Sequence, residues 1–374
     1  MKIGIIDADL IGRKKHRFPN LASMKISGYY KSKGHSVTLL LDYNEIDKYD
    51  KVFISKVFTD TPIDENILCL PNVEYGGTGF FYDKADPLPY DIEHHMPDYS
   101  LYTEWVNNKL KNGGKRLDFK YYLDYSIGFT TRGCFRGCSF CVNKNYKNVF
   151  NHSPLNEFLD KNRKYICLLD DNILGYHKWN EIFKELNSTG KKFQFKQGMD
   201  ERLLTDKKCE VISNSNYIGD YIFAFDNIED KDVIEKKLNL WNKYRNIKSN
   251  NTKFYVFCGY DRHNKYDFDF WIKDIENTFE RIKILMEHKC LPYIMRHKNY
   301  EKSPFRGTYI NLARWCNQPS FFIKKSYKEF CEANQIQGKS KLCASMRYLK
   351  ELESVSQNIA NIYFNIKFDD YKIN

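Results

Sequence analysis

The feature that most constrains the fold is a repeated pattern of short apolar segments between residues 124 and 300. Each segment reads as a strand and ends in polar residues or glycine. The six segments are 125–129, 165–169, 193–196, 221–225, 253–258 and 291–295. Strands that alternate with helices form parallel sheets. In a parallel barrel the polar strand ends collect on one face, where ligands bind. The pattern therefore predicts a parallel α/β domain with a site at the carboxyl ends of its strands.

The N-terminal segment predicts a second parallel sheet. Residues 2–6 read as a buried strand, and an amphipathic helix follows from residue 19 to about residue 31. Residues 36–41 and 51–55 then read as two further strands. Strand, helix and strand at this spacing form a parallel βαβ unit.

Three cysteines within eight residues carry the strongest chemical signal. Cys134, Cys138 and Cys141 follow the spacing C-x3-C-x2-C, and Phe140 directly precedes the third. Three thiolates hold three irons of a 4Fe–4S cube and leave the fourth iron open, whereas an electron-carrying ferredoxin normally supplies a fourth cysteine. A structural zinc site also requires four ligands, and no further C-x2-C or H-x3-H pair lies elsewhere in the chain.

This run resembles the cluster motif of the radical S-adenosylmethionine (radical SAM) enzymes. The resemblance implies a 4Fe–4S cluster on Cys134, Cys138 and Cys141, and S-adenosylmethionine as the second cofactor, with its adenine against Phe140. It also implies a partial (β/α)6 barrel over residues 124–300 and an electron donor such as flavodoxin or ferredoxin. Reductive cleavage of S-adenosylmethionine would then give a 5′-deoxyadenosyl radical for hydrogen abstraction.

By position, the same resemblance implies further contacts to S-adenosylmethionine at the strand ends. The predicted cofactor-binding residues are Asp170, Asp171, Asn172, Gln197, Arg202, Asp226 and Gly259. The first three follow the second strand, where Asp170 or Asp171 would accept a hydrogen bond from the ammonium group. The alternative is that they cap a helix. Arg202 would pair with the carboxylate, or else form a surface ion pair with Asp200 or Glu201.

After the first strand, the pattern D-x-D-x-x-G runs from Asp7 to Gly12. It resembles the D-x-H-x-x-G motif of the cobalamin-binding Rossmann-type domain that precedes many radical SAM barrels. Asp9 stands where the histidine ligand of cobalt would be, so we expect a degenerate scaffold, with cobalamin binding unlikely.

The predicted organisation has four parts. These are a cobalamin-binding-like domain at 1–90, a linker at 91–123, the barrel at 124–300 and a mostly helical segment at 301–374. In the last part, 324–334 and 341–364 read as helices. Its Cys316, Cys331 and Cys343 are either free thiols, as their wide spacing favours, or ligands of a second cluster.

Charge and hydropathy limit the classes of partner that the protein could bind. The net charge is +11, and residues 108–147 carry nine Lys or Arg against two Asp. A basic surface attracts anions such as nucleotides or nucleic acid, although solvated lysines need no partner. The chain has no apolar stretch of 18 residues and no signal peptide at its start, so we expect a cytoplasmic protein with no membrane contact.

Two alternatives stay open beside hydrogen abstraction from an unidentified small molecule. One is a radical SAM enzyme that modifies RNA or nucleotides, although no C-terminal RNA-binding domain is visible. The other is a non-catalytic iron–sulfur or zinc protein, against which the missing fourth ligand argues.

Overall fold

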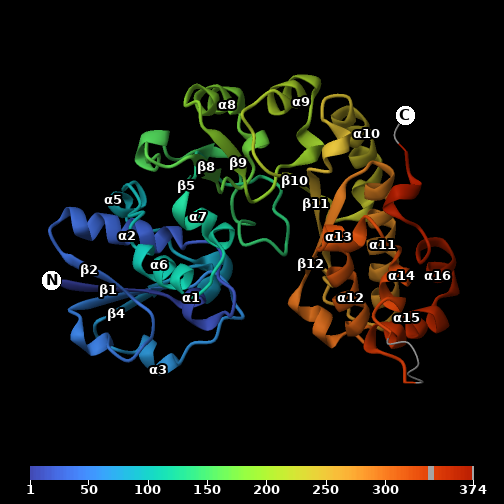
Figure 1. Ribbon diagram of the computed structural model, residues 1–374, viewed down its shortest axis with the longest axis horizontal. Coiled ribbons are helices and arrows are strands. Elements are labelled where there is room, and N and C mark those ends of the chain that lie inside the picture. Colours follow the sequence, from blue (N-terminus) through green and yellow to red (C-terminus); the bar gives the residue numbers. More distant parts are fainter. Residues whose placement is uncertain (336–340, 373–374) are drawn as a thin grey trace. The chain divides into compact units, whose positions relative to one another are not determined.

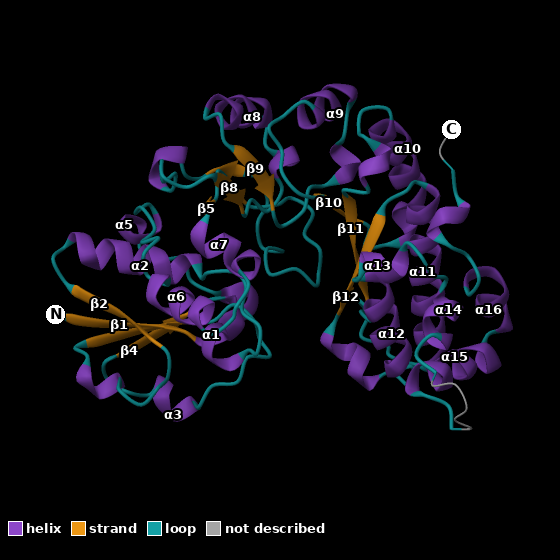
Figure 2. Cartoon of the chain, viewed as in Figure 1, coloured by secondary structure: helices purple, strands orange, loops and turns teal. Residues whose placement is uncertain are grey.

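The structure, a computed structural model, describes residues 1–335 and 341–372 and contains three parallel sheets whose strands are joined by helices (Figures 1 and 2). The predicted mixed α/β class is confirmed. The chain divides into two compact units, residues 1–176 with 184–196, and residues 177–183 with 197–374. Among the described residues, no helix has the length and apolar character needed to cross a membrane.

The first unit contains two parallel sheets and a two-stranded antiparallel pair. Its strands are β1 (Lys2–Asp7), β2 (Ser36–Leu40), β3 (Lys51–Ser55), β4 (Val73–Gly76), β5 (Tyr125–Gly128), β6 (Thr131–Arg132), β7 (Phe150–Asn151), β8 (Tyr165–Leu168) and β9 (Lys192–Phe195). Its helices are α1 (Ala8–Gly12), α2 (Leu21–Ser32), α3 (Glu65–Leu68), α4 (Thr78–Phe81), α5 (Tyr90–Glu93), α6 (Thr103–Lys111) and α7 (Lys120–Leu123). The boundary between the units runs through α8 (Trp179–Ser188).

The N-terminal sheet has the order β2-β1-β3-β4, and all its neighbours are parallel. Side chains alternate between its two faces, as strand geometry requires. Ile3 and Ile5 of β1 pack with Met24 and Ile26 of α2, whereas Ile6 packs on the other face with Ile54. Asn20 begins α2 because its side chain accepts a hydrogen bond from the Ser23 amide at 3.1 Å.

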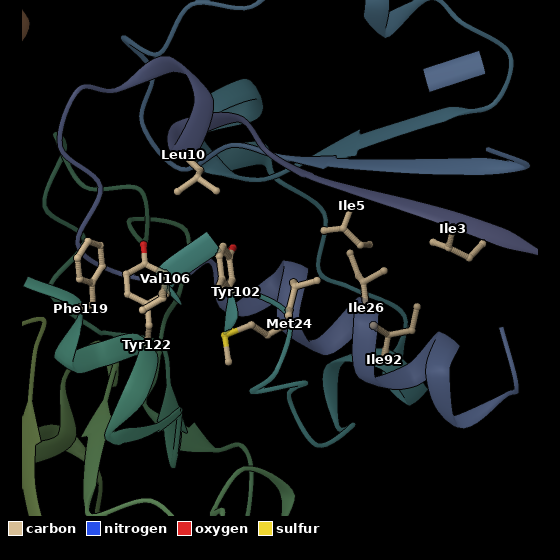
Figure 3. Packing of buried hydrophobic residues seen from close by; sticks show 11 residues of the cluster. Ile3, Ile5, Leu10, Met24, Ile26, Ile92, Tyr102, Val106, Phe119 and Tyr122 are labelled. Carbon is tan, nitrogen blue, oxygen red and sulfur yellow. The ribbon is translucent and has the colours of Figure 1, made fainter. Parts of the chain in front are cut away.

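The segment 91–123, expected as a linker, contributes helices to this domain. Tyr102 and Val106, together with Phe119 and Tyr122, lie in the same core as Ile5 (Figure 3). The few apolar residues of this segment lie on helix faces that pack against α2 and β1. The prolines and glycines around them made the segment resemble a linker. The expected domain boundaries themselves stay predictions.

The six strands predicted between residues 124 and 300 are present as two three-stranded parallel sheets. The first unit holds β5-β8-β9, and the second unit holds β10-β11-β12. The second-unit strands are β10 (Tyr221–Ala224), β11 (Thr252–Cys258) and β12 (Leu291–Arg296). Each observed strand agrees with its predicted range to within two residues at either end.

Helices cover the sheet of the second unit and form its C-terminal part. They are α9 (Asp206–Ser213), α10 (Lys231–Asn242), α11 (Phe268–Glu287), α12 (Arg306–Cys316), α13 (Pro319–Phe322), α14 (Tyr327–Glu332), α15 (Ala344–Val355) and α16 (Gln357–Tyr363). The helix predicted over 341–364 is divided at Ser356, whose hydroxyl accepts a hydrogen bond from the Ile359 amide at 3.4 Å and begins α16. The mostly helical character predicted for the described residues of 301–374 is thus present.

Candidate functional site

The three motif cysteines lie on one loop between β6 and β7. These two strands pair antiparallel, Thr131 with Asn151 and Arg132 with Phe150, and so close the base of the loop. The three thiols are partly exposed, whereas six of the other eight cysteines are buried. A partly exposed thiol can bind a metal cluster and still leave room for a further ligand.

Glycine backbone conformations shape this loop. Gly133 has φ +90°, and a side chain there would meet the Asn148 carbonyl oxygen at 2.3 Å. Gly137 has φ +59°, a conformation that residues with a Cβ rarely adopt. The two glycines that directly precede Cys134 and Cys138 therefore permit the turns of the loop.

Backbone amides form two hydrogen bonds within the loop, one of them to a cysteine sulfur. The Cys141 amide donates a hydrogen bond to the Cys138 carbonyl oxygen at 2.9 Å. The Asn143 amide donates to Cys141 Sγ at 3.4 Å. Hydrogen bonds to ligating sulfurs stabilise thiolates and tune the potential of a cluster.

Asp170, directly after β8, anchors the start of the loop from within the protein. Its buried carboxylate accepts hydrogen bonds from the Thr130 and Thr131 amides, at 3.1 and 2.6 Å, and from their hydroxyls, at 2.5 and 2.7 Å. Burial raises the pKa of Asp170, and these four donors act in the opposite direction. The carboxylate is only 1% exposed, and its four hydrogen bonds fix the start of the loop.

Asp171 joins the two ends of the cysteine run. Its Oδ2 accepts a hydrogen bond from the Gly133 amide at 2.7 Å, and its Oδ1 accepts one from Asn143 Nδ2, also at 2.7 Å. Arg132 Nε lies 3.6 Å from Oδ2. The carboxylate therefore lies beside the loop, and the Arg132 guanidinium balances part of its negative charge.

Asn172 contacts the first cysteine directly. Its Nδ2 lies 3.5 Å from Cys134 Sγ. Its Oδ1 is buried and has no hydrogen-bond partner within the described residues, and the side chain is 2% exposed. An unpaired buried acceptor costs about 1–3 kcal/mol. Phe140, three residues beyond Gly137 in the same loop, is partly exposed.

The other four predicted residues belong to the second unit. Gln197 is exposed. Arg202 donates to Asp200 Oδ1 through Nε and to Asp230 Oδ2 through Nη1, both at 2.8 Å. The ion-pair alternative is thus realised with Asp200, while Glu201 is buried and neither of its oxygens has a hydrogen-bond partner among the described residues.

Asp226 and Gly259 lie at neighbouring strand ends, after β10 and β11. Asp226 Oδ1 accepts a hydrogen bond from the Phe257 amide at 3.2 Å, and burial raises the pKa of Asp226 to about 6. The Gly259 amide donates to Asp274 Oδ2 at 2.8 Å, and Gly259 has φ +76°. Asp226 therefore links the ends of β10 and β11, and Asp274 of α11 fixes the residue that follows β11.

Sequence reasoning missed two charged residues of α11. Arg281 Nη1 donates to the carbonyl oxygens of Phe225, Asp226 and Phe257 at 3.0, 2.7 and 2.9 Å. Asp274 also accepts a hydrogen bond from Tyr309 at 2.6 Å. The sequence does contain a pattern that could have identified them. Asp274 and Arg281 lie seven residues apart on the apolar face of an amphipathic helix, where a buried charge requires a partner.

That Cys316, Cys331 and Cys343 are free thiols stays a prediction. Cys316 and Cys331 are buried, and burial raises the pKa of both thiols, that of Cys331 to about 12. Across the described residues, no three His, Cys, Asp or Glu side chains converge to hold a single metal ion. This holds for the motif as well, where each of the three thiols would bind a different iron of a cluster.

Similar solved structures include two of one enzyme, and no family model matches the chain. One is the apo, selenomethionine-labelled structure of the cobalamin-dependent S-adenosylmethionine radical enzyme OxsB, with a TM-score of 0.37 and 11% identity, covering 98% of this chain and 57% of that one. The other is OxsB with aqua-cobalamin bound, with a TM-score of 0.36 and 12% identity, covering 96% and 56%. The chain therefore spans little more than half the length of the structures that it matches.

Proposed function

We propose that this protein is a radical SAM enzyme that abstracts hydrogen from a substrate carbon. The observation that carries the proposal is the juxtaposition of three partly exposed thiols with Asn172, whose buried oxygen has no partner among the described residues. Cys134, Cys138 and Cys141 would hold a 4Fe–4S cluster. When bound, such a cluster supplies the electron that cleaves S-adenosylmethionine into methionine and a 5′-deoxyadenosyl radical.

The residues after β8 would receive the amino end of S-adenosylmethionine. Asn172 Oδ1 offers a free acceptor beside Cys134, and Asp171 adds a carboxylate that an ammonium group favours. Asp170 would act through Thr130 and Thr131, because its carboxylate is buried, whereas that of Asp171 is partly exposed. Phe140 would place its ring against adenine.

Gln197, Arg202, Asp226 and Gly259 stay proposed contacts for the remainder of the cofactor. Asp226 would accept a hydrogen bond from a ribose hydroxyl. Arg202 would have to exchange one of its two carboxylate partners for that of S-adenosylmethionine. This exchange makes Arg202 the weakest member of the proposed set.

We further propose that the N-terminal domain serves as a scaffold without a cobalt ligand at Asp9. Asp9 Oδ2 accepts a hydrogen bond from the Val57 amide at 2.7 Å, and Oδ1 accepts one from the Thr61 hydroxyl. Asp9 is buried, and these bonds join the ends of β1 and β3. Both carboxylate oxygens are therefore engaged at the ends of β1 and β3, where ligands bind in doubly wound sheets of this order.

The experiment that tests the proposed function is anaerobic reconstitution followed by paramagnetic resonance spectroscopy. The protein should hold about four irons and four sulfides, and S-adenosylmethionine should change the spectrum of the reduced cluster. Cys69→Ala, which alters an exposed cysteine outside the loop, is the matched control and should behave as the natural protein. Stoichiometric zinc without iron, or a spectrum indifferent to S-adenosylmethionine, would favour a non-catalytic metal protein.

A second candidate, an anionic nucleotide or RNA substrate, is favoured by one surface feature. An open groove of about 440 Å³ is lined by Gly12, Arg13, Lys14, Lys15, Asp60 and Thr61. Arg13 pairs with Asp60 and lies 4.2 Å from the ring centre of Phe58, which is 48% exposed. Lys14 and Lys15 are exposed and form no ion pair with a described residue. Exposed lysines in an open groove attract a phosphate.

Salt-dependent binding of a single-stranded RNA oligonucleotide tests this candidate. Lys14→Glu with Lys15→Glu should weaken binding and flatten its dependence on salt concentration, because fewer counterions are released. Lys111→Glu, on an exposed position outside the groove, should change binding far less. Equal loss in both variants would show non-specific attraction to the net charge.

A further inference from the structure

The outer side of the cysteine loop is held by two residues that follow α4. The Tyr82 hydroxyl donates a hydrogen bond to the backbone oxygen of Phe140, the residue directly before Cys141. Asp83 Oδ2 forms an ion pair with Lys144 Nζ at 3.0 Å. The backbone oxygen of Asp83 accepts a hydrogen bond from Asn145 Nδ2, also at 3.0 Å. These contacts reach both sides of the third cysteine.

Tyr82 occupies a backbone conformation that tyrosine rarely adopts. Its φ is 51° and its ψ is −111°. Such a residue costs of order 1–3 kcal/mol and persists only where its surroundings fix it, often near a functional site. The residue in this conformation is the one whose hydroxyl contacts the cysteine loop.

The preceding glycine-rich turn fixes the approach of Tyr82. A Cβ on Gly77 would lie 2.4 Å from the Lys56 carbonyl oxygen, and one on Gly79 would lie 2.5 Å from the Lys56 side chain. Lys56 is buried and donates through Nζ to the Thr61 carbonyl oxygen at 2.9 Å. The glycines therefore allow the segment after β4 to pack closely against Lys56, which follows β3. Tyr82 comes directly after this closely packed segment.

We infer that Tyr82 and Asp83 are positioning residues that hold Phe140 and Cys141 in place for the bound cofactors. This inference rests on the proposed function. Asp171 fixes the loop at Gly133 and Asn143, and Tyr82 with Asp83 fixes it at Phe140, Lys144 and Asn145. The loop is thus held from the end of β8 on one side and from the N-terminal domain on the other. The N-terminal domain is thereby a part of the cluster site whether or not it binds a ligand.

Tyr82→Phe is the sharpest test, because it removes one hydroxyl and keeps the ring. We expect iron content and melting temperature at the level of the natural protein, and an affinity for S-adenosylmethionine about fivefold to tenfold lower, the loss of one hydrogen bond. The paramagnetic spectrum of the reduced, S-adenosylmethionine-bound cluster should also change. Tyr90→Phe, at a tyrosine that is 75% exposed, is the control and should change neither. An unchanged affinity and spectrum in Tyr82→Phe would overturn the inference, and so would a loss of affinity that follows a lowered melting temperature.

A measurement on the protein without cofactors separates this inference from the proposed function. Hydrogen exchange of peptides covering residues 138–145 should be faster in Tyr82→Phe and in Asp83→Asn than in the natural protein or Tyr90→Phe. This comparison needs no cluster, so it can succeed where the natural protein holds no iron and the proposed function fails. Equal exchange in all four proteins would overturn the inference.

Discussion

Asn172 Nδ2 lies 3.5 Å from Cys134 Sγ, which connects the end of β8 to the first cysteine of the loop. The same amide leaves Oδ1 buried and without a partner among the described residues. One side chain thus contacts a proposed cluster ligand and presents an unused acceptor next to it. This relationship is the most direct link between the cysteine motif and the residues that follow the strand.

Replacing Asn172 by alanine should weaken the binding of S-adenosylmethionine while iron content is retained. The free acceptor is lost, and a hydrogen bond of this kind contributes about 1–1.5 kcal/mol, or roughly a tenfold change in affinity. Equilibrium binding to the reconstituted protein measures the change, and Asn112→Ala on an exposed helix end serves as the control. Unaltered affinity in Asn172→Ala would show that Oδ1 does not receive the cofactor.

Replacing Asp170 by asparagine should destabilise the loop and lower iron loading. The amide retains one acceptor oxygen for four donors, and hydrogen bonds to a charged group contribute about 1.5–3 kcal/mol each. Thermal unfolding and iron analysis after reconstitution give the two readouts. If Asp170→Asn kept its stability but lost S-adenosylmethionine binding, the residue would be a direct ligand and not a positioning group.

Glu93 should make the first unit sensitive to acid. It lies 2.8 Å from Lys25 Nζ of α2 and 3.3 Å from His152 Nε2, just after β7. Burial acts to raise the pKa of Glu93, but His152 and Lys25 outweigh it and lower the pKa to about 2. A depressed folded-state pKa gives stability that is present above pH 4.5 and lost as the pH falls from 4.5 to 2, here of order 3 kcal/mol.

The variant Glu93→Gln should therefore be less stable than the natural protein at neutral pH and change less between pH 4.5 and 2. Denaturant unfolding at a series of pH values measures both effects. Glu65→Gln, at an exposed position, should follow the natural profile. A Glu93→Gln profile parallel to that of the natural protein would show that the ion pair contributes nothing across this range.

Cobalamin should not be retained through a protein ligand at Asp9. The buried carboxylate already receives the Val57 amide and the Thr61 hydroxyl, and a carboxylate does not replace histidine as a cobalt ligand. Asp9→Ala should lower stability by about 1–3 kcal/mol, since it leaves these buried donors unpaired. Equilibrium dialysis that found stoichiometric cobalamin on the natural protein would contradict the scaffold role and move methyl transfer to the leading reaction.

The strands and the site loop could be predicted because their signals are local. Each predicted strand is a short apolar run before polar residues, and the cysteine spacing with Gly133 and Gly137 specifies a turn. The contacts between distant segments could not be predicted, since Tyr82 reaches Phe140 across 58 residues and Arg281 reaches Phe225 across 56. For the same reason, the sequence alone grouped Asp170, Asp171 and Asn172 as equivalent acceptors, whereas the fold gives each a different set of partners.

The central claim is that the cysteine loop holds a cluster that cleaves S-adenosylmethionine. The most direct measurement is the release of 5′-deoxyadenosine and methionine by the reduced natural protein, by Cys138→Ala and by Cys69→Ala. We predict slow release, even without substrate, by the natural protein and by Cys69→Ala, and none by Cys138→Ala, which lacks a cluster ligand. Equal release by the natural protein and Cys138→Ala under dithionite would contradict the claim.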